Sequence, residues 1–139
     1  MRTGHICGSE ISLQYGDCIE DKGSKMSTSR SLILAGAIFG LLGVVLGAIG
    51  VHALHDTLDP KALGTFQTGV RFQMYHALAL LAVGLLSDRW KSGLVKLSGI
   101  LFIAGVVLFS GSLYILAVTG ISVFGAIAPL GGTSLIAAW

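Results

Sequence analysis

The sequence predicts an all-α fold, an integral membrane bundle of four transmembrane helices with a short helical extension before the second. Two bulk properties point to this class: 53% of the residues are hydrophobic and 12% are charged, against about 25% charged in soluble domains. The third observation is a run of 43 residues, from Leu97 to Trp139, without Asp, Glu, Lys, Arg or His. A hydrocarbon core about 30 Å thick needs about 20 helical residues, so this run must cross, turn and cross again.

The N-terminal segment, residues 1–29, is polar and has no apolar period, so we predict that it is disordered. Met26 begins "MSTSRSLILAG", which looks like a natural start and makes residues 1–25 a candidate upstream extension. Cys7 and Cys18 both lie in this segment. A disulfide between them stays open as an alternative, but their spacing alone does not argue for it, and two free or incidental thiols are the favoured interpretation.

Residues 30–139 form the predicted transmembrane domain. Its four helices are expected at about 31–54, 70–86, 97–118 and 121–139. The first contains an uncharged run of 21 residues, from Ser31 to Val51. Secretory signal peptides have a shorter apolar core of about 7–15 residues, so we expect a retained helix.

Basic residues predict the orientation. Six lie before the first helix or around the loop between the second and third: Lys22, Lys25, Arg30, Arg89, Lys91 and Lys96. The opposite side offers Lys61 and Arg71. Because loops rich in Lys and Arg stay in the cytoplasm, both termini are expected there.

The second helix has a clear start signal in Asp59-Pro60, an N-cap followed by a proline at the first helical position. A helix from Pro60 to Leu86 would be about 40 Å long at about 1.5 Å per residue, longer than the hydrocarbon core. Its first turns should therefore lie in the outer interface. Arg71 is expected where the helix enters the membrane, with its side chain reaching to the headgroups.

Glycines recur along one face of the first helix at alternating spacings of four and three: Gly36, Gly40, Gly43, Gly47 and Gly50. Small residues let helix backbones approach closely in lipid. We interpret the seam as a helix-packing face in preference to an ion path.

A candidate polar cluster in the outer half of the membrane draws on three helices and comprises His52, Gln67, Arg71, Gln73, Tyr75, His76, Ser110, Ser112 and Tyr114. Gln67, Arg71 and Tyr75 form one stripe of the second helix, whereas Gln73 and His76 lie on a different face. Two interpretations stay open. The cluster lines a small water-filled site, or its groups bond to neighbouring helices and lock the bundle, which we favour.

The fourth helix contains a predicted break at Pro129, Gly131 and Gly132. Proline cannot donate to the carbonyl four residues earlier. Broken helices near the midplane mark binding sites in transporters, but proline kinks also occur in helices that only pack. We favour a kink without a binding role.

The sequence offers no enzyme signature: no nucleophile with a base and an orienting group, no intramembrane carboxylate pair and no phosphate loop. A net charge of +2 does not argue for nucleic acid. His52, His55 and His76 suggest a weak metal or haem hypothesis. Their spacing matches no dedicated motif, so neither a metal nor another cofactor is expected.

Four motifs in this order resemble a known family: "GAIGVHAL" (47–54), "FQTGVRFQMYHALALLAVGLL" (66–86), "LFSGSLY" (108–114) and "PLGG" (129–132). The resemblance covers about residues 27–139. It is to the small four-helix membrane proteins called domain of unknown function 423, which include bacterial inner-membrane proteins and the animal transmembrane protein 256. Val51 stands where the family usually has a smaller residue, and Ala128 often appears there as Thr. Relatives generally continue past the position of Trp139 into a short basic tail.

The family has no established activity, so the resemblance implies a fold and a location and carries over no catalytic residue. We expect a structural or partner-binding protein of the bacterial inner membrane, in contact with the lipid bilayer and with another membrane protein or itself. The alternative is a small transporter or channel that uses the outer polar cluster.

Overall fold

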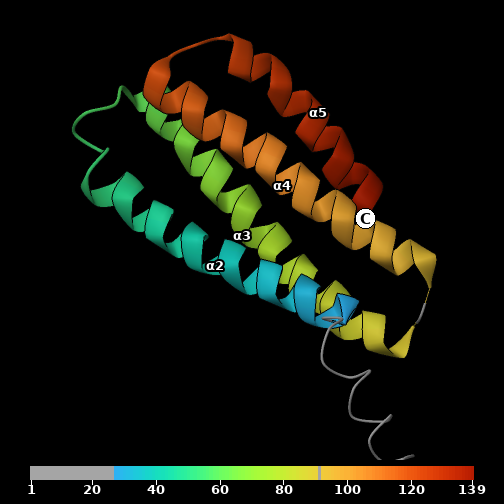
Figure 1. The fold of residues 1–139 in the computed structure, drawn as a ribbon. Coiled ribbons are helices and arrows are strands. Elements are labelled where there is room, and N and C mark those ends of the chain that lie inside the picture. Colours follow the sequence, from blue (N-terminus) through green and yellow to red (C-terminus); the bar gives the residue numbers. More distant parts are fainter. Residues whose placement is uncertain (1–26, 91) are drawn as a thin grey trace, which may run out of the picture.

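The structure is a computed structural model that describes residues 27–90 and 92–139. Across these residues the chain forms four α-helices and no strand: α2 (Thr28–His52), α3 (Pro60–Arg89), α4 (Gly93–Thr119) and α5 (Val123–Ala138) (Figure 1). The predicted all-α class is confirmed. The predictions for Met26, the two cysteines and the segment before residue 27 lie outside the described residues.

The first helix begins earlier than predicted. Thr28 and Ser29 are helical, so the expected disorder up to residue 29 is wrong at its end. Ser29 is 3% exposed, and its hydroxyl donates to the carbonyl of Gly84 on α3 over 2.9 Å. This contact between helices holds the first turn in place, and no local pattern in the sequence reveals it.

The second predicted helix and its extension are one continuous element of 30 residues. The Asp59 carboxylate accepts from the backbone N–H groups of Lys61 and Ala62, at 2.9 and 3.1 Å, and Pro60 follows as the first helical residue. At about 1.5 Å per residue, α3 is about 45 Å long. It therefore exceeds a hydrocarbon core of about 30 Å and must extend into an interface.

The helix α4 begins four positions before the predicted Leu97, at Gly93. The Ser92 hydroxyl caps it by accepting from the N–H of Leu94 at 3.3 Å. At its other end Gly120 has a φ of 71°, a left-handed conformation that glycine adopts without steric cost and that commonly ends helices. The turn into α5 is short for this reason.

The helix α5 runs without interruption through Pro129, so the helix is not broken there, and the favoured kink stays a prediction. Proline removes one hydrogen bond, and the packing of α5 on α4 holds the rest of the helix. Of the described helices, α2, α3 and α4 are long and apolar enough to cross a membrane. The 16 residues of α5 are apolar but shorter.

The four described helices pack in chain order, α2 on α3, α3 on α4 and α4 on α5 (Figure 1). The α2 backbone approaches α4 only marginally, and the α5 backbone approaches neither α2 nor α3. The hydrophobic core cluster lies towards the start of α2 and the end of α5 and contains Leu32, Ala79, Leu80, Phe102, Val106, Leu135 and Ala138. Gln73 and Tyr114 lie further along α3 and α4, whereas His76 packs against Phe102 of this cluster.

Candidate functional site

Four of the five seam glycines lie against α3. A side chain at Gly36 would meet the Ala77 carbonyl, and one at Gly50 would meet the Phe66 ring. Gly43 and Gly47 similarly face Met74 and Val70. Gly40 differs, since a Cβ there would meet nothing within 4 Å. The seam thus lets the α2 backbone approach α3 closely, as small residues do between membrane helices.

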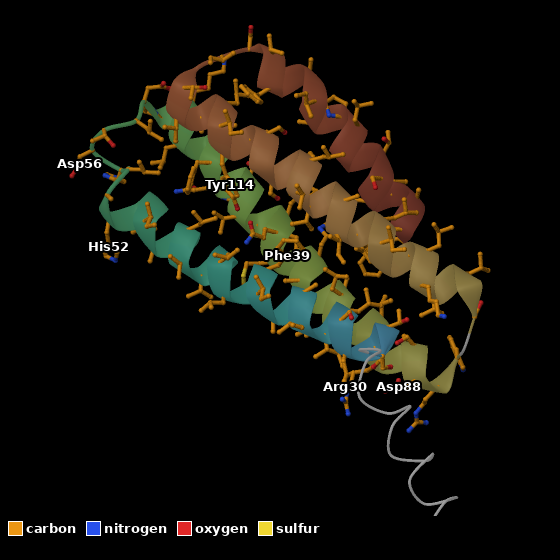
Figure 2. The ribbon with its side chains drawn as sticks, in the orientation of Figure 1. Arg30, Phe39, His52, Asp56, Asp88 and Tyr114 are labelled. Carbon is orange, nitrogen blue, oxygen red and sulfur yellow. The ribbon has the colours of Figure 1, made fainter. Side chains whose placement is uncertain are left out.

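The Gln73 side chain connects three helices. Its Nε2 donates to the Phe39 carbonyl of α2 over 2.8 Å, and its Oε1 accepts from the Tyr114 hydroxyl of α4 over 2.9 Å. Figure 2 labels Phe39 on α2 and Tyr114 on α4. Gln73 itself lies on α3 and is 4% exposed. A primary amide carries donors and an acceptor on one flat group, so a single residue satisfies a carbonyl on one side and a hydroxyl on the other. We call Phe39, Gln73 and Tyr114 the three-helix bridge.

Gly43 leaves room for the Gln73 side chain to reach the Phe39 carbonyl of α2. It lies one helical turn after Phe39, so its N–H is the usual intrahelical partner of the Phe39 carbonyl. A Cβ at Gly43 would lie 2.5 Å from the Met74 sulfur and 3.7 Å from Gln73 Nε2. A larger residue would push Met74 outward and separate α2 from the amide.

Gly69 lets the Tyr114 ring of α4 approach α3 closely, as Gly43 does for α2. The Tyr114 ring covers it so closely that a Cβ at Gly69 would lie 2.8 Å from Tyr114 Cε1. The ring also packs against Phe66, with centroids 4.9 Å apart. Two glycines on opposite sides of the bridge therefore allow its helices to come within hydrogen-bonding distance of one amide.

His76 lies one turn from Gln73 in aromatic surroundings. Its Nδ1 donates to the Phe72 carbonyl of its own helix over 2.7 Å, because a carbonyl can only accept. Its ring lies 5.6 Å from the Phe102 ring and 6.5 Å from the Trp139 ring, measured between centroids. At 6% exposure it is a buried packing residue.

The two serines of α4 have different surroundings. Ser112 donates to the Phe109 carbonyl over 2.9 Å and lines a cavity between α4 and α5. Ser110 is 1% exposed, and its hydroxyl has no hydrogen-bond partner among the described residues. A helical serine can satisfy its hydroxyl by rotating towards a carbonyl of the preceding turn. The buried hydroxyl therefore does not require a ligand.

The nine residues of the predicted polar cluster do not form one site. Gln73 and Tyr114 are bonded, and His76 and Ser110 are buried on the same two helices. The predicted polar stripe of α3 has a different environment. Of its three residues, Gln67 is half-buried, whereas Arg71 and Tyr75 are exposed. His52 is exposed at the far end of α2 (Figure 2).

The hypothetical metal ligands also lie apart. The described residues contain no group of three His, Cys, Asp or Glu side chains that could hold a metal ion. His55 instead pairs with the carboxylate of the adjacent Asp56 at 2.9 Å, and both side chains are exposed. His76 is buried in α3.

Three serines that the sequence analysis did not select also bond between helices. Ser29 donates to the Gly84 carbonyl, Ser98 to the Ala138 carbonyl over 2.6 Å, and Ser134 to the Leu101 carbonyl over 3.0 Å. Serines inside apolar helices commonly have this role, which is the signal that could have identified them. Their partners are backbone carbonyls, which sequence patterns do not mark.

Comparison with known proteins gives one matching family and several relatives. Residues 46–132 match the family described as "Protein of unknown function (DUF423)". The UPF0382 membrane protein YwdK of Bacillus subtilis (strain 168) is 52% identical over 111 residues, which cover 79% of this chain and 90% of the relative. The UPF0382 inner membrane protein YgdD of Escherichia coli (strain K12) is 38% identical over 112 residues, covering 81% and 86%.

A third relative, the UPF0382 membrane protein SSP2132 of Staphylococcus saprophyticus, is 42% identical over 110 residues, covering 79% of this chain and 91% of the relative. No solved structure matches the chain. The family match covers more than half of the residues, and it includes the three-helix bridge residues Gln73 and Tyr114. The chain therefore belongs to the DUF423 family, and the relatives named above are membrane proteins.

Proposed function

We propose that the protein is a structural or partner-binding helix bundle of the bacterial inner membrane, and not an enzyme. The three-helix bridge carries this proposal. Gln73 is the buried amide of α3, and both ends of its side chain are bonded to other helices. A group used in this way fixes the relative positions of α2, α3 and α4.

The serine contacts support the same function. Ser29, Ser98 and Ser134 each donate to a carbonyl of a neighbouring helix. Hydrogen bonds between membrane helices contribute about 0.6 kcal/mol on average and up to about 2 kcal/mol. Together with the bridge they join every adjacent pair of helices, which is what a rigid scaffold needs.

The charged ends support a multi-pass topology with cytoplasmic termini. Arg30 and Asp88 lie at one end of the bundle, and His52 and Asp56 lie at the opposite end (Figure 2). Arg89 follows Asp88 as the last residue of α3, and Lys96 lies in the first turn of α4. Because Lys and Arg accumulate on the cytoplasmic side, we assign the Arg30 end to the cytoplasm and the His52 end to the outside.

The terminal helices have faces open to lipid or to a partner membrane protein. On α2, Leu41 and Val44 are 66% and 62% exposed, and on α5 Ile136 is 76% exposed. Lipid tails cover such apolar faces as well as another helix does. A partner would therefore have to be selected by shape, through close packing on small residues such as Gly40.

Reconstitution into liposomes tests this function against the transporter alternative. A scaffold should leave vesicles tight to protons, Na⁺, K⁺ and small solutes under imposed gradients, as measured with pH-sensitive and ion-sensitive dyes. Gln73→Leu should lower the stability of the protein and change no flux. A flux carried by the wild-type protein and abolished by Gln73→Leu or Arg71→Gln would overturn the proposal.

A further inference from the structure

We propose that a groove between α2 and α3, close to Arg71, binds one anionic phospholipid. The lipid phosphate would meet the Arg71 guanidinium, and one acyl chain would lie along the glycines of α2. The groove is lined by Gly47, Gly50 and Val51 of α2 and by Phe66, Gln67, Val70 and Arg71 of α3. It lies at the end of the bundle that we assign to the outside.

The shape of the groove fits a lipid chain better than an enclosed solute. Its volume is about 160 Å³, whereas sites that enclose small ligands measure about 300–1,000 Å³. Gly47 and Gly50 form one wall, and the half-buried Val70 and the buried Phe66 of α3 line the other side. An acyl chain that continues into the bilayer would cover this apolar surface without having to be enclosed.

The positive charge of Arg71, which lines the groove, favours an anionic ligand. Arg71 is exposed, and no carboxylate of the described residues lies within 4 Å of its guanidinium. Asp56 pairs with His55, Asp59 caps α3, and Asp88 lies towards the other end of that helix. A guanidinium offers a planar fork of donors that matches phosphate. An anionic headgroup would supply the counter-charge that the protein does not.

The depth of Arg71 is that of the phosphate layer. Arg71 and Arg89 are 18 positions apart on α3, about 27 Å at about 1.5 Å per residue. The hydrocarbon core is about 30 Å thick, so the two arginines mark its two boundaries. Tyr75, one turn deeper than Arg71, is 61% exposed, as expected for an aromatic residue of the interfacial belt.

The same observations favour lipid over a second copy of the chain. A second copy would have to present an acidic group at the depth of Arg71. The acidic residues of the described chain are Asp56 and Asp59 in the loop before α3, and Asp88 near its cytoplasmic end. None of them lies at that depth, whereas every anionic phospholipid of the outer leaflet carries its phosphate there.

Native mass spectrometry of the detergent-purified full chain tests the assignment, with dioleoyl phosphatidylglycerol and dioleoyl phosphatidylcholine as the added lipids. We expect one tightly retained phosphatidylglycerol. Arg71→Gln should weaken its binding about tenfold, the effect of one lost charge-assisted contact. Lys61→Gln, which removes a cation of α3 outside the groove, should leave it unchanged, and Arg71→Lys should restore part of the affinity.

A second variant and a soluble anion distinguish a bound lipid from a free anion and from a second copy of the chain. Gly47→Leu keeps the charge and fills the groove, so it should also release the lipid, and circular dichroism reports whether the variant is folded. Equal retention of phosphatidylcholine would overturn the proposal, as would unchanged binding by Arg71→Gln. Inorganic phosphate that displaces the lipid at millimolar concentration would show a free-anion site instead. A dimer lost on Arg71→Gln would show that a second copy occupies the groove.

Discussion

Tyr114 donates its phenolic hydrogen to Gln73 Oε1 over 2.9 Å, and this bond joins α4 to α3. The same amide reaches Phe39 of α2 over 2.8 Å. The amide side chain thus lies at the only point where a single described side chain bonds to helices on both sides of its own. Its removal should affect the whole assembly more than the loss of any one serine.

Gln73→Leu should therefore lower the free energy of unfolding by about 1–3 kcal/mol, because two hydrogen bonds are lost and the half-buried Tyr114 side chain loses its partner. Thermal unfolding in a mild detergent measures the change. Gln67→Leu is the matched control, since it makes the same chemical change on the same helix at a half-buried position without an interhelical bond among the described residues. Equal effects of the two variants would contradict the bridge.

Tyr114→Phe should be milder than Gln73→Leu because it removes one of the two bonds and keeps the ring on Gly69. The double variant should cost less than the sum of the single variants, since both remove the same Tyr114–Gln73 contact. Strict additivity in the double-mutant cycle would show that the two side chains are not coupled.

Gly131→Ala should loosen α5 from α4. A Cβ at Gly131 would overlap the Phe109 backbone, which cannot move as a side chain can. We expect a loss of about 1–3 kcal/mol from overpacking, measured by unfolding in detergent. Gly40→Ala is the control: nothing lies within 4 Å of a Cβ there, so better helix propensity should leave stability unchanged or raise it by up to about 1 kcal/mol.

His76→Ala should destabilise the protein by about 2–4 kcal/mol, since it leaves a cavity against the buried Phe102 ring. His76→Leu keeps most of the volume and should cost less than about 1.5 kcal/mol. If the imidazole had a chemical role, the two variants would be equally defective in any activity of the purified protein. Parallel unfolding and flux measurements on both variants distinguish packing from chemistry.

Cysteine labelling should reveal the topology. In a variant whose native Cys7 and Cys18 are replaced, Thr57→Cys in the loop before α3 should react with a membrane-impermeant maleimide in intact spheroplasts. Ser92→Cys, between α3 and α4, should react only after lysis. The opposite pattern would reverse the orientation and would place the Arg71 groove in the cytoplasmic leaflet.

The sequence predicted those features of the fold that depend on local or compositional signals. The apolar composition indicated the membrane class, and Asp59-Pro60 marked the start of α3 at the residue where the structure has it. The start of α2 was predicted too late because Ser29 is held by the Gly84 carbonyl of another helix. An interruption at Pro129 is absent from α5 because proline removes one hydrogen bond while the residues on both sides of it stay helical.

Only part of the candidate site could be predicted from the sequence. Gln73, His76, Ser110 and Tyr114 were identified by type, but their separation from Arg71 and Tyr75 depends on how α3 is rotated against its neighbours. A helical period shows which residues share a face without showing which face is covered. The Phe39 carbonyl could not be predicted at all, since every residue of an apolar helix has one.

The order in which the helices pack also bears on how the protein is made. Because α2 packs on α3, α3 on α4 and α4 on α5, each new segment finds its partner in the segment just before it. Assembly can therefore follow synthesis, one helical hairpin at a time, without waiting for the last helix to close a ring. Such sequence-local contacts favour fast folding, and they leave a nascent membrane chain with few opportunities to pair wrongly before it is complete.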